Sequence, residues 1–109
     1  MKFHLGRLVI TPGVLTSASV DEICHAIDSH VCGNWGDVSA IARNTNDNAL
    51  LTGGQLLSVY QAPDGVELRV LTTADRLTTT VHLPSESGHQ RTPNWTPMEF
   101  CRVTGNTVK

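Results

Sequence analysis

The side chains best suited to chemistry in the first third of the chain are two cysteines and two histidines, Cys24, His25, His30 and Cys32. Thiolate and imidazole groups are the usual ligands of zinc. On a helix, ligands that share a metal lie three or four residues apart, whereas Cys24 and His30 differ by a rotation of about 240°. We therefore expect no metal site. Cys24 is predicted to be a small buried residue, and His30 a histidine at the edge of the core with a local hydrogen bond.

Asp75 and Arg76 form the most enzyme-like pair, in the segment 73–76. In a functional interpretation, Arg76 binds an anion or a carboxylate of a partner while Asp75 holds the turn. In a structural interpretation, Asp75 accepts a hydrogen bond within the turn and Arg76 makes a salt bridge. The turn-forming residue types favour the structural interpretation, and both residues remain candidates for a binding site.

Trp35 and His82 complete the candidate binding residues. Trp35 lies in an Asn-Trp-Gly connection, where an aromatic ring is either packed between helices with its indole N–H bonded locally or exposed as an anchor. His82 shares one strand face with Thr78 and Thr80, a pattern typical of an ordinary solvated strand because threonine favours strands. A nucleophile needs a base within hydrogen-bond reach, held by a third group. The spacing shows no such set, so no catalytic residue is predicted.

Two helices are expected to position these residues. The segment 19–31 has the capping-box spacing of Ser19 and Glu22, and its apolar residues form one stripe. A second, weaker helix is predicted over 37–51, with Asp37 as its cap and a run of poor helix formers at 44–48.

Four strands are predicted over 3–11, 55–61, 66–73 and 77–84, and Pro12-Gly13 reads as a turn. The strands alternate apolar and polar residues, which indicates a sheet covered on one side. The predicted fold class is therefore α+β. Two helices pack on one face of an antiparallel sheet that contains a three-stranded C-terminal meander plus an N-terminal strand.

Length and composition bound the classes of partner. A chain of 109 residues is one domain; we place that domain at 1–84 and treat 85–109, which has little periodicity, as a C-terminal extension. The net charge is −2 and the basic residues are scattered, which disfavours nucleic acid. No apolar run is long enough to span a bilayer. Cys24, Cys32 and Cys101 form an odd set that indicates free thiols in a reducing cytoplasm.

Several segments together resemble a family of short uncharacterised proteins encoded on bacterial plasmids, prophages and other mobile elements. Among the matching residues the Trp-Gly and Ala-Asp-Arg segments are the most specific. The matching segments are Met1–Phe3, Leu5-Gly6, Thr11–Gly13, His30–Gly36, Asn48–Leu50, Gly54, Leu56–Tyr60, Asp64-Gly65, Leu71–Arg76 and Thr79–Pro84.

The resemblance implies a genetic setting and a shape, and it brings no established reaction. Relatives sometimes carry a restriction-methylase subunit label, which this chain does not support because it has no glycine-rich cofactor loop after a strand. Members of the family tend to stop just after the Leu-Pro that matches Leu83-Pro84. The remainder looks like an extension read into neighbouring sequence, such as the recombination site of an integron cassette.

Three functions are compatible with the sequence. The first is an accessory protein that binds another protein or forms a homo-oligomer, without a cofactor. The second is a small hydrolase or toxin-like ribonuclease that uses exposed His82, Arg69 and Arg76, with His4 as a further candidate; the negative net charge argues against RNA binding. The third is a small-ligand binder with a cleft around Trp35.

Overall fold

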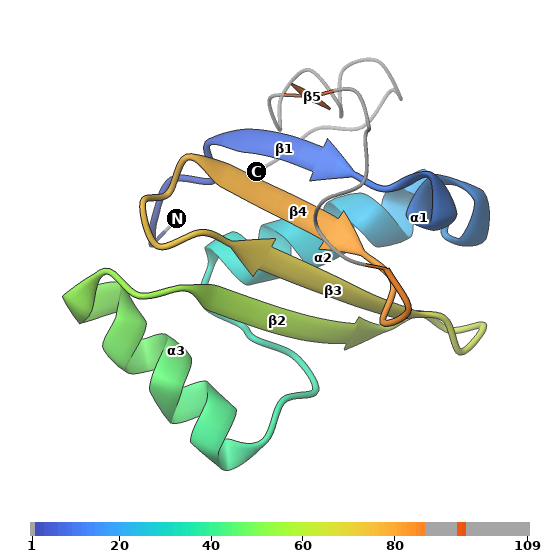
Figure 1. Cartoon of the computed structure of the whole chain (residues 1–109). Helices are drawn as coiled ribbons and strands as arrows, with labels where there is room; N and C mark the ends of the chain where they lie inside the picture. The colour runs from blue at the N-terminus through green and yellow to red at the C-terminus, as the bar shows by residue number, and fades with distance from the viewer. Residues whose placement is uncertain (1, 87–93, 96–109) are drawn as a thin grey trace.

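A computed structural model describes residues 2–86 and the pair 94–95. The described chain holds three helices and five strands (Figure 1). In chain order they are β1 (Arg7–Ile10), α1 (Pro12–Ser17), α2 (Val20–Val31), α3 (Ala40–Thr52), β2 (Leu56–Gln61), β3 (Glu67–Thr72), β4 (Thr78–His82) and β5 (Asn94–Trp95). The α+β class is therefore confirmed. Within the described part of the chain, no helix combines the length and apolar character needed to cross a bilayer.

The sheet is mixed, so the prediction of an antiparallel sheet was wrong. The strand order is β2-β3-β4-β1-β5, and β1 runs parallel to β4 while the other neighbours are antiparallel. The pairing of β1 with β4 joins residues about 70 positions apart, such as Leu8 and Thr79. An alternating pattern specifies which residues share a face of a strand, but it carries no information on a strand's neighbour or direction.

Helix α1 was missed because Pro12-Gly13 was interpreted as a turn. Thr11 is the N-cap of this helix, its hydroxyl accepts the N–H of Val14 at 3.4 Å, and Pro12 is the first helical residue. Proline is well suited to that position because its missing N–H would have no partner within the helix. The Thr-Pro step was thus a helix start.

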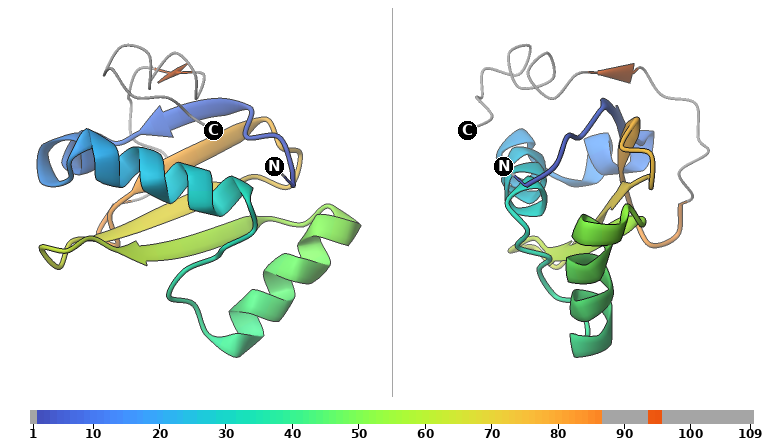
Figure 2. Two further views of the ribbon diagram at one scale, coloured as in Figure 1. Left: turned by 180° about the vertical axis from the view of Figure 1, so that it is seen from behind. Right: turned by 90° about the vertical axis from the view of Figure 1, so that its left-hand side faces the viewer.

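Helix α2 follows the sequence prediction closely. Ser19 is the N-cap, and the capping box with Glu22 is complete, at 3.1 Å and 2.8 Å. The apolar stripe of Ile23, Ile27 and Val31 is buried, and it belongs to one core cluster with residues of β1, β3 and β4. Figure 2 shows α2 lying across one face of the sheet.

Helix α3 differs from the prediction in its start and its place. Its N-cap is Ser39, whose hydroxyl accepts the N–H of Ala42 at 3.1 Å, and Asp37 lies before it. The helix lies beside strand β2 at the edge of the sheet (Figures 1 and 2). Only Asn46 and Ala49 of α3 are buried. The expectation that two helices cover one face was therefore wrong, because α3 lacks the apolar stripe that would hold it there.

The face of the sheet opposite α2 is less solvated than expected. Thr80 and His82, predicted to lie in solvent, are only 6% and 8% exposed. Strand β4 lies between β3 and β1, so Thr80 has Leu71 and Val9 as its cross-strand neighbours. The threonine-rich pattern gives no sign of this burial.

Candidate functional site

A groove of about 500 Å³ lies between α3 and the open face of β2 and β3. Its apolar surface comes from Leu57 and Val59 of β2, from Ala42 of α3 and from Val38, which lies just before that helix. Polar side chains complete the lining: Asp37, Ser39, Thr45, Asn46, Gln55 and Arg69. We name this hollow the α3 groove.

Asn46 fastens α3 to the sheet and thereby sets one wall of the groove. Its side-chain amide donates to the carbonyl of Leu57 at 2.8 Å, and its side-chain oxygen accepts the N–H of Leu57 at 3.2 Å. Strand β2 is an edge strand, and Leu57 directs its backbone groups away from β3. A single side chain thus supplies the hydrogen bonds that a neighbouring strand would make.

The connection around Gly36 covers the next part of the same edge. Val59 donates its N–H to the carbonyl of Trp35 at 3.1 Å and accepts the N–H of Asp37 at 2.7 Å. Gly36 has φ +76°, and an added Cβ would lie 2.1 Å from the carbonyl oxygen of Val59. Glycine is required here by both its backbone conformation and the close approach. Tyr60 contributes a hydroxyl hydrogen bond to this loop and has a pKa raised to about 12 by burial.

Trp35, a predicted binding residue, is buried at 1% exposure. Its indole N–H donates to the carboxylate of Asp47 on α3 at 2.9 Å, and its ring stacks on Phe3 at 6.2 Å. This is the packed arrangement of the two that the sequence allowed. Trp35 does not line the α3 groove; it supports α3 from behind.

Arg76 also supports α3. Its guanidinium donates to the carbonyls of Gly54 at 2.6 Å, Thr73 at 3.0 Å and Ala49 at 3.1 Å, and it lies 5.7 Å from the ring centroid of Phe3. A cation is favourable beside the carbonyls at the end of a helix. The structural interpretation of Arg76 named the wrong kind of partner. Its guanidinium bonds to backbone carbonyls instead of making the expected salt bridge.

Asp75 stabilises the turn in the way the sequence indicated. Its carboxylate accepts the hydroxyl of Thr73 at 2.6 Å and the N–H of Leu77 at 3.0 Å. These bonds, from Thr73 first and then from Leu77, lower the pKa of Asp75. Arg76 follows with φ +61°, the left-handed conformation that ends many hairpin loops.

His30 heads a buried chain of hydroxyl groups and is fully enclosed, deeper than the expected core edge. Thr79 donates its O–H to the carbonyl of Leu5 at 2.7 Å, so it must accept from Thr72, 2.7 Å away. Thr72 in turn accepts from Nε2 of His30 at 2.9 Å. The chain therefore places a proton on Nε2. Because burial keeps the imidazole neutral, Nδ1 accepts the hydroxyl of Ser58 at 2.5 Å.

The arrangement of Ser58, His30 and Thr72 has the order of a nucleophile, a base and a supporting group. Sequence reasoning did not find it, because the three residues come from α2, β2 and β3 and share no motif. All three are 0% exposed, so no substrate reaches the hydroxyl of Ser58. Burial, followed by the positive charge of Arg76, lowers the pKa of His30 to about 3. The cluster organises the core.

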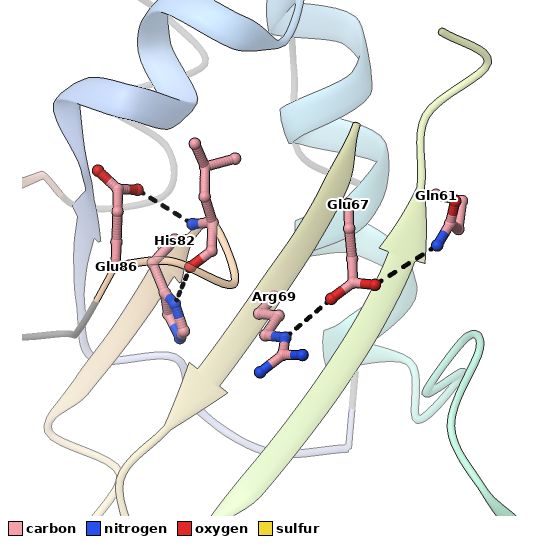
Figure 3. A network of polar contacts seen from close by, with 6 residues as sticks. Gln61, Glu67, Arg69, His82 and Glu86 are labelled. Carbon is pink, nitrogen blue, oxygen red and sulfur yellow. Dashed lines mark hydrogen bonds and ion pairs between the residues drawn. The ribbon is translucent and has the colours of Figure 1, made fainter. Parts of the chain in front are cut away.

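His82 lies in a polar network on the open face of the sheet (Figure 3). Its Nδ1 donates to the carbonyl of Leu83 at 2.9 Å, and the N–H of Leu83 donates to Glu86 at 3.0 Å. Thr11 donates its hydroxyl to the same carboxylate at 2.5 Å. Burial opposes ionisation of Glu86, but the hydrogen bonds from Thr11 and Leu83 outweigh it and lower the pKa. These hydrogen bonds hold the segment that follows β4 against Thr11.

The neighbouring part of the network borders the α3 groove. Arg69 pairs with Glu67 at 2.9 Å, and Gln61 donates to Glu67 at 3.5 Å. Arg69 is the cross-strand neighbour of both Val59 and His82. Figure 3 shows Arg69 and His82 side by side on this face, so the structure brings one predicted residue, His82, close to the groove.

The two cysteines and two histidines considered for a metal do not converge. Cys24 is buried, while His25 and Cys32 are exposed, and both ring nitrogens of His30 are engaged by hydroxyl groups. Across residues 2–86, no three His, Cys, Asp or Glu side chains are grouped to hold a metal ion. Cys101 and nearly all of the predicted extension 85–109 lie outside the described residues.

Comparison with protein-family models, with curated proteins and with solved structures finds no match for this chain. The function proposed below therefore depends on the geometry of the α3 groove. The sequence did contain one sign of it. Ile41 and Leu51 are large apolar residues in a helix without a continuous apolar stripe, and they are 79% and 87% exposed.

Proposed function

We propose that the protein is a small accessory protein of a mobile genetic element that acts by binding another protein, and that the α3 groove is its binding surface. The groove itself carries the proposal, as a hollow of about 500 Å³ with an apolar lining from Leu57, Val59 and Val38. Protein interfaces combine an apolar centre with a polar rim. Asp37 and Arg69 supply such a rim on either side of Val59.

The exposed residues of α3 support the same surface. Four large hydrophobic residues are exposed in the part of the chain that the structure describes, and two of them, Ile41 and Leu51, belong to this helix. Ile41 lies one turn before Thr45, a lining residue, and therefore borders the groove. An apolar side chain of a partner placed against Ile41 enters the groove directly.

A small apolar molecule is the second candidate ligand, since small-molecule sites occupy roughly 300–1,000 Å³. A reaction by His82 and Arg76 has less support. Arg76 is committed to four backbone carbonyls, and His82 is 8% exposed with Nδ1 bonded to Leu83. The setting of a mobile element, and with it the bacterial cytoplasm, is supported by the family resemblance of Trp35-Gly36 and 74–76.

The test compares two arginine substitutions on α3. Ala42→Arg fills the groove, whereas Asn44→Arg adds the same side chain to an exposed position of the helix outside its lining. Proteins retained by the tagged full chain in a bacterial host are identified by mass spectrometry, purified and titrated calorimetrically against all three forms. We expect a partner that binds the wild type and Asn44→Arg and loses at least tenfold in affinity for Ala42→Arg.

Equal affinity for all three forms would place binding elsewhere on the molecule. Loss of affinity with both substitutions would point to a general effect of positive charge on α3. Thermal unfolding of each variant shows that the fold is retained. If no purified protein binds the wild type, the proposed function is wrong.

A further inference from the structure

Beside the α3 groove lies an exposed apolar side chain, that of Ile41, which is able to enter a groove of this kind. Ile41 is 79% exposed, and it borders a hollow lined by Val38, Ala42, Leu57 and Val59. We infer that a second copy of this chain occupies the groove, with Ile41 of each copy inserted into the groove of the other. This inference rests on the proposed function because it uses the same surface.

Two-fold symmetry makes the arrangement self-consistent. In a dimer with a two-fold axis the same patch is used twice, so residue i of one copy meets residue j of the other and the reverse. A projecting side chain and a hollow must then lie beside each other on one patch. Ile41 and Ala42 are consecutive residues, the first projecting and the second lining the hollow.

The backbone edge next to the groove favours side-chain contact over strand pairing. The outward N–H and C=O groups of Leu57 are bonded to Asn46, and those of Val59 to Trp35 and Asp37. A second copy therefore finds no free hydrogen-bonding groups at these two positions of β2. Contact through α3 and the groove needs none of these bonds to break.

The charges around the groove allow two identical surfaces to meet. The lining holds one acidic side chain, Asp37, and one basic side chain, Arg69. Juxtaposed like charges would oppose association, but this lining has no excess of either sign. One helix side and one groove make a small contact, so we expect a weak dimer whose population rises with concentration.

The test measures mass and contact in the full chain. Sedimentation velocity over a concentration series follows the wild type, Ile41→Gln and Leu51→Gln. Leu51 is the matched control because it is equally apolar and even more exposed on the same helix, at 87%. It lies one turn from no lining residue of α3, whereas Ile41 lies one turn before Thr45. We expect the wild type and Leu51→Gln to dimerise alike, and Ile41→Gln to dissociate at least tenfold more readily.

Isotope-filtered NMR on a mixture of labelled and unlabelled wild type locates the contact. We expect intermolecular contacts between the methyl groups of Ile41 and those of Leu57 or Val59. A wild type that stays monomeric at the highest concentration, or an Ile41→Gln form that dimerises as the wild type does, overturns the inference. The proposed function is separate in outcome, since a foreign partner sensitive to Ala42→Arg can bind a monomer.

Discussion

Helices α2 and α3 are similar in length but are attached to the sheet in different ways. α2 buries a stripe that includes Ile23, Ile27 and Val31 on the face formed by β1, β3 and β4. α3 buries only Asn46 and Ala49. Ala49 and the half-buried Leu50 join a small apolar cluster with Trp35 and Leu56, and the polar contacts of Asn46, Asp47 and the Ala49 carbonyl fix the position of the helix.

The difference separates two tasks within one small domain. Apolar burial is non-directional and holds α2 wherever its stripe meets the sheet. Hydrogen bonds act between particular atoms, so they hold α3 at the edge of the sheet while leaving space between its first turns and β2. The α3 groove is that space. A helix held by hydrogen bonds between particular atoms can therefore keep its position while the side that borders the groove stays uncovered.

The largest expected effect comes from breaking the apolar attachment. Ile27→Ala removes a fully buried side chain of α2 and should lower the free energy of unfolding by about 2–5 kcal/mol. Ile41→Ala on α3, 79% exposed, should change it by less than about 0.5 kcal/mol. Urea unfolding monitored by circular dichroism measures both. Equal losses of unfolding free energy would show that the two side chains contribute alike to stability and would contradict the difference between α2 and α3.

Next in size is the loss of the guanidinium that holds the end of α3. Arg76→Met keeps an unbranched stem at the same φ but removes the donors to Ala49 and Gly54. Hydrogen bonds to charged groups contribute about 1.5–3 kcal/mol, so the opening free energy of the last turn of α3 should fall by that amount. Native-state hydrogen exchange measures it. Arg43→Met, at an exposed position of the same helix, is the control, and similar exchange in both variants would contradict the role of Arg76.

His30 is the polar exception on α2, and it makes stability depend on pH. Its pKa is about 3 in the folded state against 6.5 in the unfolded chain, so the unfolded state binds the proton more readily. This contribution is complete above pH 6.5 and declines as the pH falls toward 3. At 1.36 kcal/mol per pH unit, about 2 kcal/mol should be lost between pH 6.5 and 5.

Urea unfolding at pH 7, 6 and 5 tests this dependence, with His30→Gln as the comparison. Glutamine has no charge to acquire and can still reach one hydroxyl of the buried chain. We expect a clearly flatter dependence in His30→Gln. Asp75 and Glu86, whose pKa values are lowered, contribute below this range. A wild type whose stability stays level from pH 7 to pH 5 would show that His30 does not titrate as its burial requires.

The smallest effect on stability should come from substituting Asn46, whose side chain bonds to the outer backbone edge of β2. Asn46→Ala leaves the N–H and C=O of Leu57 to water, at a cost of about 1 kcal/mol because the edge can be rehydrated. The amide of Leu57 should exchange faster while the amides of α2 do not change. Asn44→Ala, two positions earlier and exposed, should leave the Leu57 amide as it is. Unchanged exchange in Asn46→Ala would mean that α3 is held by other contacts.

Local patterns predicted most of the elements. The capping box of Ser19 and Glu22 is present as expected, and β2 and β3 lie within one residue of the predicted ends. The errors lie where one signal had two meanings. Pro12-Gly13 was interpreted as a turn but lies in the first turn of a helix capped by Thr11, and Asp37 was interpreted as the cap two residues before Ser39, the actual one.

The candidate site was harder to predict than the elements. Of the four predicted binding residues, Trp35 and Arg76 support helix α3, Asp75 holds the turn between β3 and β4, and His82 lies beside Arg69 of the groove lining. The groove is lined instead by residues such as Val38, Ala42 and Val59. Those residue types carry no chemical signature, so only their arrangement in space marks them as a site.

The sequence by itself determined the α+β class, the α2 stripe and the turn at Asp75, because each depends on residues close together in the chain. Tertiary structure decided the parallel pairing of β1 with β4, the position of α3 at the edge of β2 and the burial of His30 with Ser58. Each of these joins segments far apart in the chain, and periodicity within a segment carries no record of its distant neighbour. The α3 groove exists only once those distant contacts are made.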